Sequence, residues 1–104
     1  ASGLALAEPF GALLEAWGHA MNGNAPGALH AYRRVPDMRM MAIDPQFPLI
    51  MQQVGAALLA SRIREGEAAR RACGRDALSL AAEFWGRYGQ HEDATRCRAW
   101  LDAS

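Results

Sequence analysis

The sequence predicts an all-α protein, because three features of its composition favour helices over strands. Alanine, the strongest helix former, supplies 22 of the 104 residues. β-branched residues are scarce, with two valines, three isoleucines and the single threonine Thr95. Apolar residues recur every three or four positions in segments bounded by Gly, Pro, Asn or Asp. We therefore expect five or six antiparallel helices in one domain over residues 1–104, with residues 1–7 as a flexible N-terminus.

The first two predicted helices form an antiparallel hairpin. The first covers about residues 8–21, since Pro9 suits a first helical turn and apolar residues follow at helical spacing. These apolar residues are Phe10, Leu13, Leu14, Trp17 and Met21. Asn24 is the expected N-cap of a second helix over about residues 26–34. The short connection between the two indicates that they lie side by side.

A proline-bounded segment separates this hairpin from the third predicted helix. The apolar residues between Pro36 and Pro45 favour a packed loop there over a free linker. The third helix is predicted from Pro45 to about Arg64. Its buried stripe comprises Phe47, Ile50, Met51, Val54, Ala57 and Leu58. Because Leu49 and Ile63 lie off that stripe, we expect this helix to occupy the centre of the fold and to contact two neighbours.

The C-terminal third predicts a short helical piece followed by a second hairpin. This piece covers residues 68–73 before Gly74, and it is either a short continuation of the third helix or a separate turn and a half. Asp76 is the predicted cap of the next helix, whose apolar face ends at Gly89. A last helix follows over about residues 92–102. Its inward residues are Ala94, Cys97, Trp100 and Leu101.

The two predicted hairpins share a pattern of helix, glycine-containing turn and second helix with an early alanine. Their turn glycines, Gly23 and Gly89, lie 66 residues apart, which is twice 33. The matching positions in the second hairpin are Leu78, Ala81, Ala82, Trp85 and Ala94, and in the first hairpin Ala28 and Tyr32. This pattern resembles tetratricopeptide repeats, whose unit is about 34 residues, over about two thirds of the chain. The resemblance implies a short solenoid and an adaptor, co-chaperone or assembly-factor role; a compact helical bundle is the alternative architecture.

Charge and local composition exclude several classes of function. Eleven arginines, with no lysine, balance eleven acidic residues, so the chain carries no general attraction for nucleic acids or anionic membranes. No apolar run has the length of a membrane span, and no glycine-rich loop has the spacing of a phosphate cradle. We therefore expect a cytoplasmic protein with reduced thiols, no cofactor and no membrane or nucleic-acid partner.

Few residues combine in a way that suggests catalysis or metal binding. Cys73, Cys97 and His91 could supply ligands or a nucleophile, but neither cysteine belongs to a Cys-x-x-Cys pair and no acidic orienting residue accompanies them. We therefore predict a non-enzymatic protein without a metal site. A cysteine-dependent enzyme or redox switch is the third hypothesis.

The most informative candidates are residues suited to binding another protein. They are Met38, Met40, Met41, Trp100, Arg62, Arg70 and Arg71. Flexible thioethers adapt to an apolar partner, an exposed tryptophan can anchor one, and the arginines favour an acidic partner. The sequence thus predicts a protein-protein interaction module that holds a peptide or amphipathic helix in an apolar groove. The main alternative is a small helical subunit that homodimerises or belongs to a larger complex.

Overall fold

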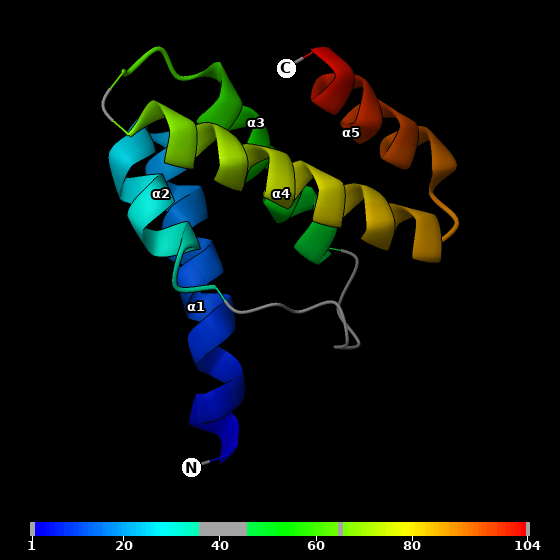
Figure 1. Cartoon of the computed structure of the whole chain (residues 1–104). Helices are drawn as coiled ribbons and strands as arrows, with labels where there is room; N and C mark the ends of the chain where they lie inside the picture. Colours follow the sequence, from blue (N-terminus) through cyan, green and yellow to red (C-terminus); the bar gives the residue numbers. More distant parts are fainter. Residues whose placement is uncertain (1, 36–45, 65, 104) are drawn as a thin grey trace.

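The computed structural model describes residues 2–35, 46–64 and 66–103, and within these ranges every regular element is an α-helix (Figure 1). The helices are α1 (Ser2–Met21), α2 (Ala25–Tyr32), α3 (Gln46–Ala60), α4 (Glu67–Arg87) and α5 (His91–Ala103). The prediction of an all-α fold is confirmed. The radius of gyration is 13.1 Å, the value expected for one compact chain of about 100 residues.

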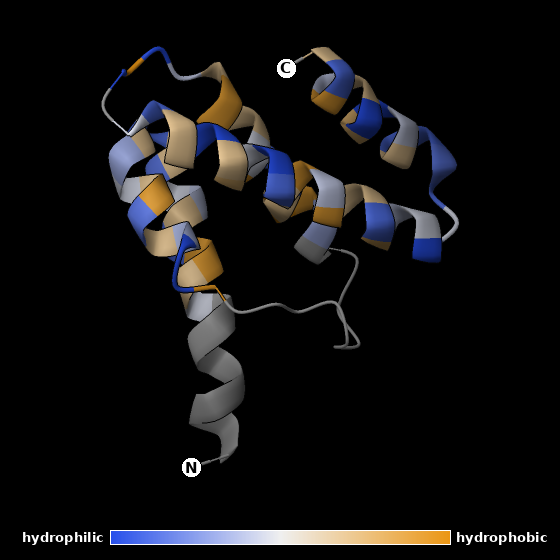
Figure 2. Cartoon of the chain, viewed as in Figure 1, coloured by the Kyte–Doolittle hydropathy of each residue, from blue (hydrophilic) through white to orange (hydrophobic). Residues whose placement is uncertain are grey.

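Helix α3 lies at the centre of the fold and packs against α1, α2 and α4, as predicted for a helix that is apolar on more than one face. Helix α4 crosses α3, and α5 returns along α4 after a tight turn (Figure 1). Figure 2 shows that hydrophilic and hydrophobic residues alternate along α4 and α5, as expected for helices with one face toward the core.

The two hairpin turns have the same backbone geometry. Gly23, between α1 and α2, has φ +74°, and Gly89, between α4 and α5, has φ +77°. In each turn the amide of the residue after the glycine donates to the carbonyl five residues earlier, over 2.8 Å in both cases. This is the Schellman arrangement, in which a left-handed glycine ends a helix. The predicted turn at Gly23 and the predicted helix stop at Gly89 are both confirmed.

The core is formed mainly by α3 and α4, with one side of each remaining helix. Among the largest fully buried side chains are Leu13, Met51, Val54, Leu58, Leu78 and Cys97. Leu14, Trp17 and Met21, which recur at helical spacing in α1, lie outside the core and are 41%, 37% and 53% exposed. Among the described side chains of α1, Leu13 and Ala16 belong to the core, and Ala20 packs against it.

Two predicted helix ends are wrong. Helix α1 begins at Ser2 and not near Glu8, because the alanines and leucines that precede Pro9 are strong helix formers. Helix α3 ends at Ala60 and not near Arg64. Beyond its end, the Ser61 hydroxyl accepts a 3.3 Å hydrogen bond from the amide of Ile63, which turns the chain away from the helix axis.

Helix α4 is continuous from Glu67 to Arg87, so both predictions for residues 68–73 are wrong. These residues neither continue α3 nor form a separate piece, but lie in the first turns of α4. The chain does not turn at Gly74. This glycine lies inside α4, at the point where α4 crosses α3 next to Gly55. Asp76 is not a cap. Its carboxylate accepts a 2.7 Å hydrogen bond from the Tyr32 hydroxyl and so joins α4 to α2.

Candidate functional site

Three hollows lie next to one another around the C-terminal end of α3. We name them the central hollow, the α2-side hollow and the α5-side hollow, with volumes of about 360, 240 and 280 Å³. The central hollow shares Ala25 and Ile63 with the α2-side hollow and Ala60 with the α5-side hollow. Because the central hollow has a lining residue in common with each of the other two, we call the three together the hollow row.

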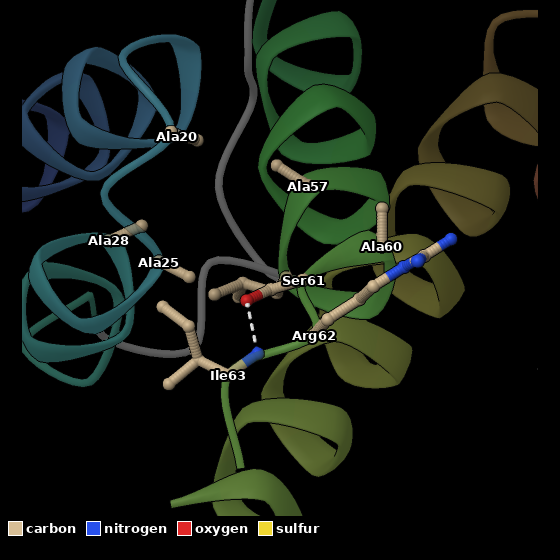
Figure 3. A pocket seen from close by; sticks show the side chains of 10 residues that line it. Ala20, Ala25, Ala28, Ala57, Ala60, Ser61, Arg62 and Ile63 are labelled. Carbon is tan, nitrogen blue, oxygen red and sulfur yellow. Dashed lines mark hydrogen bonds between the residues drawn. The ribbon is translucent and has the colours of Figure 1, made fainter. Parts of the chain in front are cut away.

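The central hollow exists because the helices around it present very small side chains. Its walls include Ala20, Gly23, Ala25, Ala28, Ala57 and Ala60. Figure 3 shows Ala20, Ala25 and Ala28 of α1 and α2 on one side of the hollow and Ala57 of α3 on the other, with Ile63 beside Ala25. The methyl groups of these alanines are too small to fill the space between the helices. A larger aliphatic side chain from a partner could occupy it.

The outer hollows extend the apolar surface to both sides. Pro26, Leu29 and Ile63 line the α2-side hollow. Leu59 and Trp100 line the α5-side hollow, and the Trp100 side chain is 40% exposed. Apolar surface that faces water next to small hollows is typical of a protein-binding site.

Among the described residues, one arginine and no acidic residue line each hollow. Arg62 borders the central hollow, Arg70 the α2-side hollow and Arg71 the α5-side hollow. The Arg62 side chain extends away from Ile63 and toward Ala60 (Figure 3). Arg71 forms a 3.5 Å ion pair with Glu67, but both side chains are about half exposed, so water screens this pair strongly.

Arg70 occupies a different environment from the one predicted. The sequence places it in a solvated basic run, which is wrong, because the residue is only 3% exposed. Its guanidinium donates to the carbonyl of Leu58 and, over 3.1 Å, to that of Ile63. The Leu58 carbonyl belongs to the last turn of α3, where carbonyls lack helical partners, and Ile63 lies in the segment that follows the helix. The buried charge thereby fixes the end of α3 and the segment that carries Ile63.

The position of Trp100 depends on contacts that hold α5 against α3 and α4. The side-chain oxygen of buried Gln52 accepts hydrogen bonds from the Trp85 indole over 2.8 Å and from the Cys97 thiol over 3.4 Å. Near the end of α5, Arg75 donates to the carbonyl of Leu101 over 3.0 Å. Hydrogen bonds among residues of α3, α4 and α5 thus fix the position of α5, which carries Trp100 into the lining of the α5-side hollow.

The structure brings together four of the seven residues predicted to bind a partner. Arg62, Arg70, Arg71 and Trp100 all line the hollow row. The other three, Met38, Met40 and Met41, lie outside the described residues.

Sequence reasoning missed the small-residue walls and the role of Ile63, which is 41% exposed and borders two hollows. The available signal was the group of alanines near the end of the third helix, Ala56, Ala57 and Ala60. Helical periodicity does not show whether such a group is covered.

The cysteines are poorly suited to nucleophilic chemistry at neutral pH. Both thiols are free. Burial raises the pKa of Cys97, and the nearby Asp93 carboxylate raises it further. Burial also raises the pKa of Cys73. Protonated thiols are weak nucleophiles, and among the residues that the structure describes no three His, Cys, Asp or Glu side chains gather as metal ligands.

Comparison of the chain with protein-family models, with curated proteins and with solved structures finds no match in any of the three searches. The resemblance to tetratricopeptide repeats therefore stays a prediction. Within the described ranges, none of the helices combines the length and the apolar character that crossing a bilayer requires.

Proposed function

We propose that this protein is a non-enzymatic interaction module that binds another protein through the hollow row. The observation that carries the proposal is that the central hollow has lining residues in common with each outer hollow: Ala25 and Ile63 with the α2-side hollow, and Ala60 with the α5-side hollow. A partner could place consecutive apolar side chains into adjacent hollows and bury Ile63 and Trp100 together. Anchors of this kind supply most of the binding energy at protein interfaces.

The local structure favours a preformed site over one that must fold around its partner. Arg70 fixes the end of α3, and the Gln52 hydrogen bonds hold α5. A site on rigid elements loses less conformational entropy on binding, so a small apolar contact can still give a specific complex. In the cell, we expect the module to act as an adaptor or assembly factor for a cytoplasmic partner. The adaptor or assembly role is the one that the repeat resemblance implies.

The alternative is that a second copy of the chain covers the same surface. The exposed Leu14, Trp17 and Met21 of α1 and Leu49 of α3 favour it, because they add apolar area outside the hollow row. Sedimentation over a concentration series distinguishes the two. A monomer at all concentrations excludes the homodimer, and a concentration-dependent dimer supports it.

The proposal is tested by affinity capture with matched variants. Ala60→Gln places a polar side chain between two hollows at an exposed helix end. Ala99→Gln makes the same change at an exposed position of α5 that lines none of the three hollows. The wild type and Ala99→Gln should retain the same stoichiometric partner from a lysate of the source cell, and Ala60→Gln should lose it. Equal retention by all three, or retention of no protein, contradicts the proposal.

A further inference from the structure

From the charges around the hollow row we infer that its partner is an acidic amphipathic helix, an inference that rests on the proposed function. The first observation is the asymmetry of charge. Arg62, Arg70 and Arg71 each border one hollow, whereas no aspartate or glutamate of the described residues lines any of them. This imbalance is local, because the whole chain has no net charge.

The second observation is that the charge of Arg70 is not neutralised by an acidic residue in the described part of the chain. The guanidinium is almost fully buried, and its hydrogen bonds go to two carbonyl oxygens. Its Nε has no hydrogen-bond partner among the described residues. A buried cation without a counterion attracts a carboxylate more strongly than a solvated cation does, because water screens it less. A carboxylate in the α2-side hollow would therefore be favoured.

The third observation concerns the form of the partner. The described part of the chain contains no strand, so it presents no sheet edge to which an extended peptide could add hydrogen bonds. A helix satisfies its own backbone groups and docks through side chains alone. Aliphatic residues on one face would enter the hollows, and acidic residues beside that face would meet Arg62 and Arg71.

Charge complementarity of this kind changes both affinity and salt dependence. Reversing the two exposed arginines should weaken the complex at least about tenfold, since it replaces attraction by repulsion at both sides of the row. Raising the salt concentration should weaken the wild-type complex in the same direction, because the pairs with Arg62 and Arg71 are exposed to solvent.

The test is selection from a displayed library of helical peptides. Aliphatic residues occupy one face, and each remaining position is Asp, Asn or Lys in equal proportion. We expect selection on the wild type to enrich peptides with Asp beside the aliphatic face. Their affinity should fall at least about tenfold for the double variant Arg62→Glu, Arg71→Glu and stay within about twofold for Arg98→Glu. Arg98 is an exposed residue of α5 that lines none of the three hollows, and circular dichroism checks that each variant is folded.

The outcomes separate this inference from the proposed function. Enriched peptides with no excess of Asp, or with equal affinity for the wild type and the double variant, overturn the acidic partner but leave a protein-binding row. Enriched peptides that bind Ala60→Gln as tightly as the wild type, or no enrichment at all, contradict the hollow row as a binding site and thus the proposed function itself.

Discussion

Gly55 of α3 and Gly74 of α4 face each other where the two helices cross. A Cβ atom at Gly55 would lie 2.9 Å from the carbonyl oxygen of Gly74, and one at Gly74 would lie 3.1 Å from that of Gly55. No larger residue fits at either position without moving backbone. This contact brings the two helices close together and so determines where the end of α3, and with it the hollow row, lies relative to α4.

The close crossing predicts that Gly74→Ala destabilises the fold. Alanine at an ordinary helix position is about 1 kcal/mol more favourable than glycine. At Gly74, however, the new methyl group would lie 2.9 Å from Leu59 Cγ and close to backbone, so we expect a net loss of about 1–3 kcal/mol. Gly86→Ala is the matched control in the same helix, where nothing lies within 4 Å, and it should leave stability equal or slightly higher. Urea unfolding measures both, and a stabilised Gly74→Ala variant would show that the crossing is loose.

Arg70 is predicted to stabilise the fold through the two carbonyls it binds. Arg70→Met keeps most of the apolar stem but leaves the carbonyls of Leu58 and Ile63 without their charged donor. Each hydrogen bond from a charged donor contributes about 1.5–3 kcal/mol, so the loss of both should lower the free energy of unfolding by about 3–6 kcal/mol. Arg62→Met, at an exposed position, should change it by less than about 0.5 kcal/mol. Similar losses for the two variants would refute the capping role.

Two consecutive glutamines give a controlled comparison of buried and exposed hydrogen bonds. Gln52 accepts from the buried Trp85 indole over 2.8 Å, and Gln53 accepts from the exposed Trp17 indole over 2.6 Å. Gln52→Met should cost about 1–3 kcal/mol, because the Trp85 N–H is then left unsatisfied in the core. Gln53→Met should cost less, since water can replace the acceptor at Trp17. Thermal unfolding followed by tryptophan fluorescence measures both, and the reverse order would contradict this arrangement.

The two cysteines predict a loss of stability at alkaline pH. Burial raises the pKa of Cys97 and of Cys73 in the folded protein, so the unfolded chain loses its thiol protons first as the pH rises. The free energy of unfolding should therefore decrease above about pH 8.5, the ordinary thiol value, and be unaffected by these groups at lower pH. The chain has no lysine, so few other groups titrate in this range. Cys73→Ser with Cys97→Ser should flatten the alkaline decrease in urea unfolding, and an identical slope would exclude the thiols as its cause.

The sequence was sufficient to predict the elements that depend on local signals. The glycine stops at Gly23 and Gly89 and the Asn24 cap follow from short-range backbone geometry, and all three are observed. Gly74 was misinterpreted as a break, because its role depends on Gly55, which is 19 positions away and on another helix. A glycine at a helix crossing and a glycine at a helix end have the same local sequence signal.

The candidate site was only partly predictable for the same reason. Trp100 and the arginines carry chemistry that can be recognised in a sequence, and they line the hollow row. The burial of Arg70 depends on the end of α3, and the hollows depend on alanines from three helices meeting at one place. Neither property belongs to a single segment, so periodicity and composition could not show it.

The central claim is that the hollow row contacts a different protein, and site-specific photo-cross-linking in the source cell tests it most directly. A photoreactive phenylalanine derivative replaces Trp100 in one variant and Arg98 in the other. Both positions are exposed on α5, but of the two only Trp100 lines a hollow. We predict a cross-linked product with one other protein from position 100 and none from position 98. Products of the same yield from both positions, or a product from position 100 with the mass of two copies of this chain, would contradict the claim.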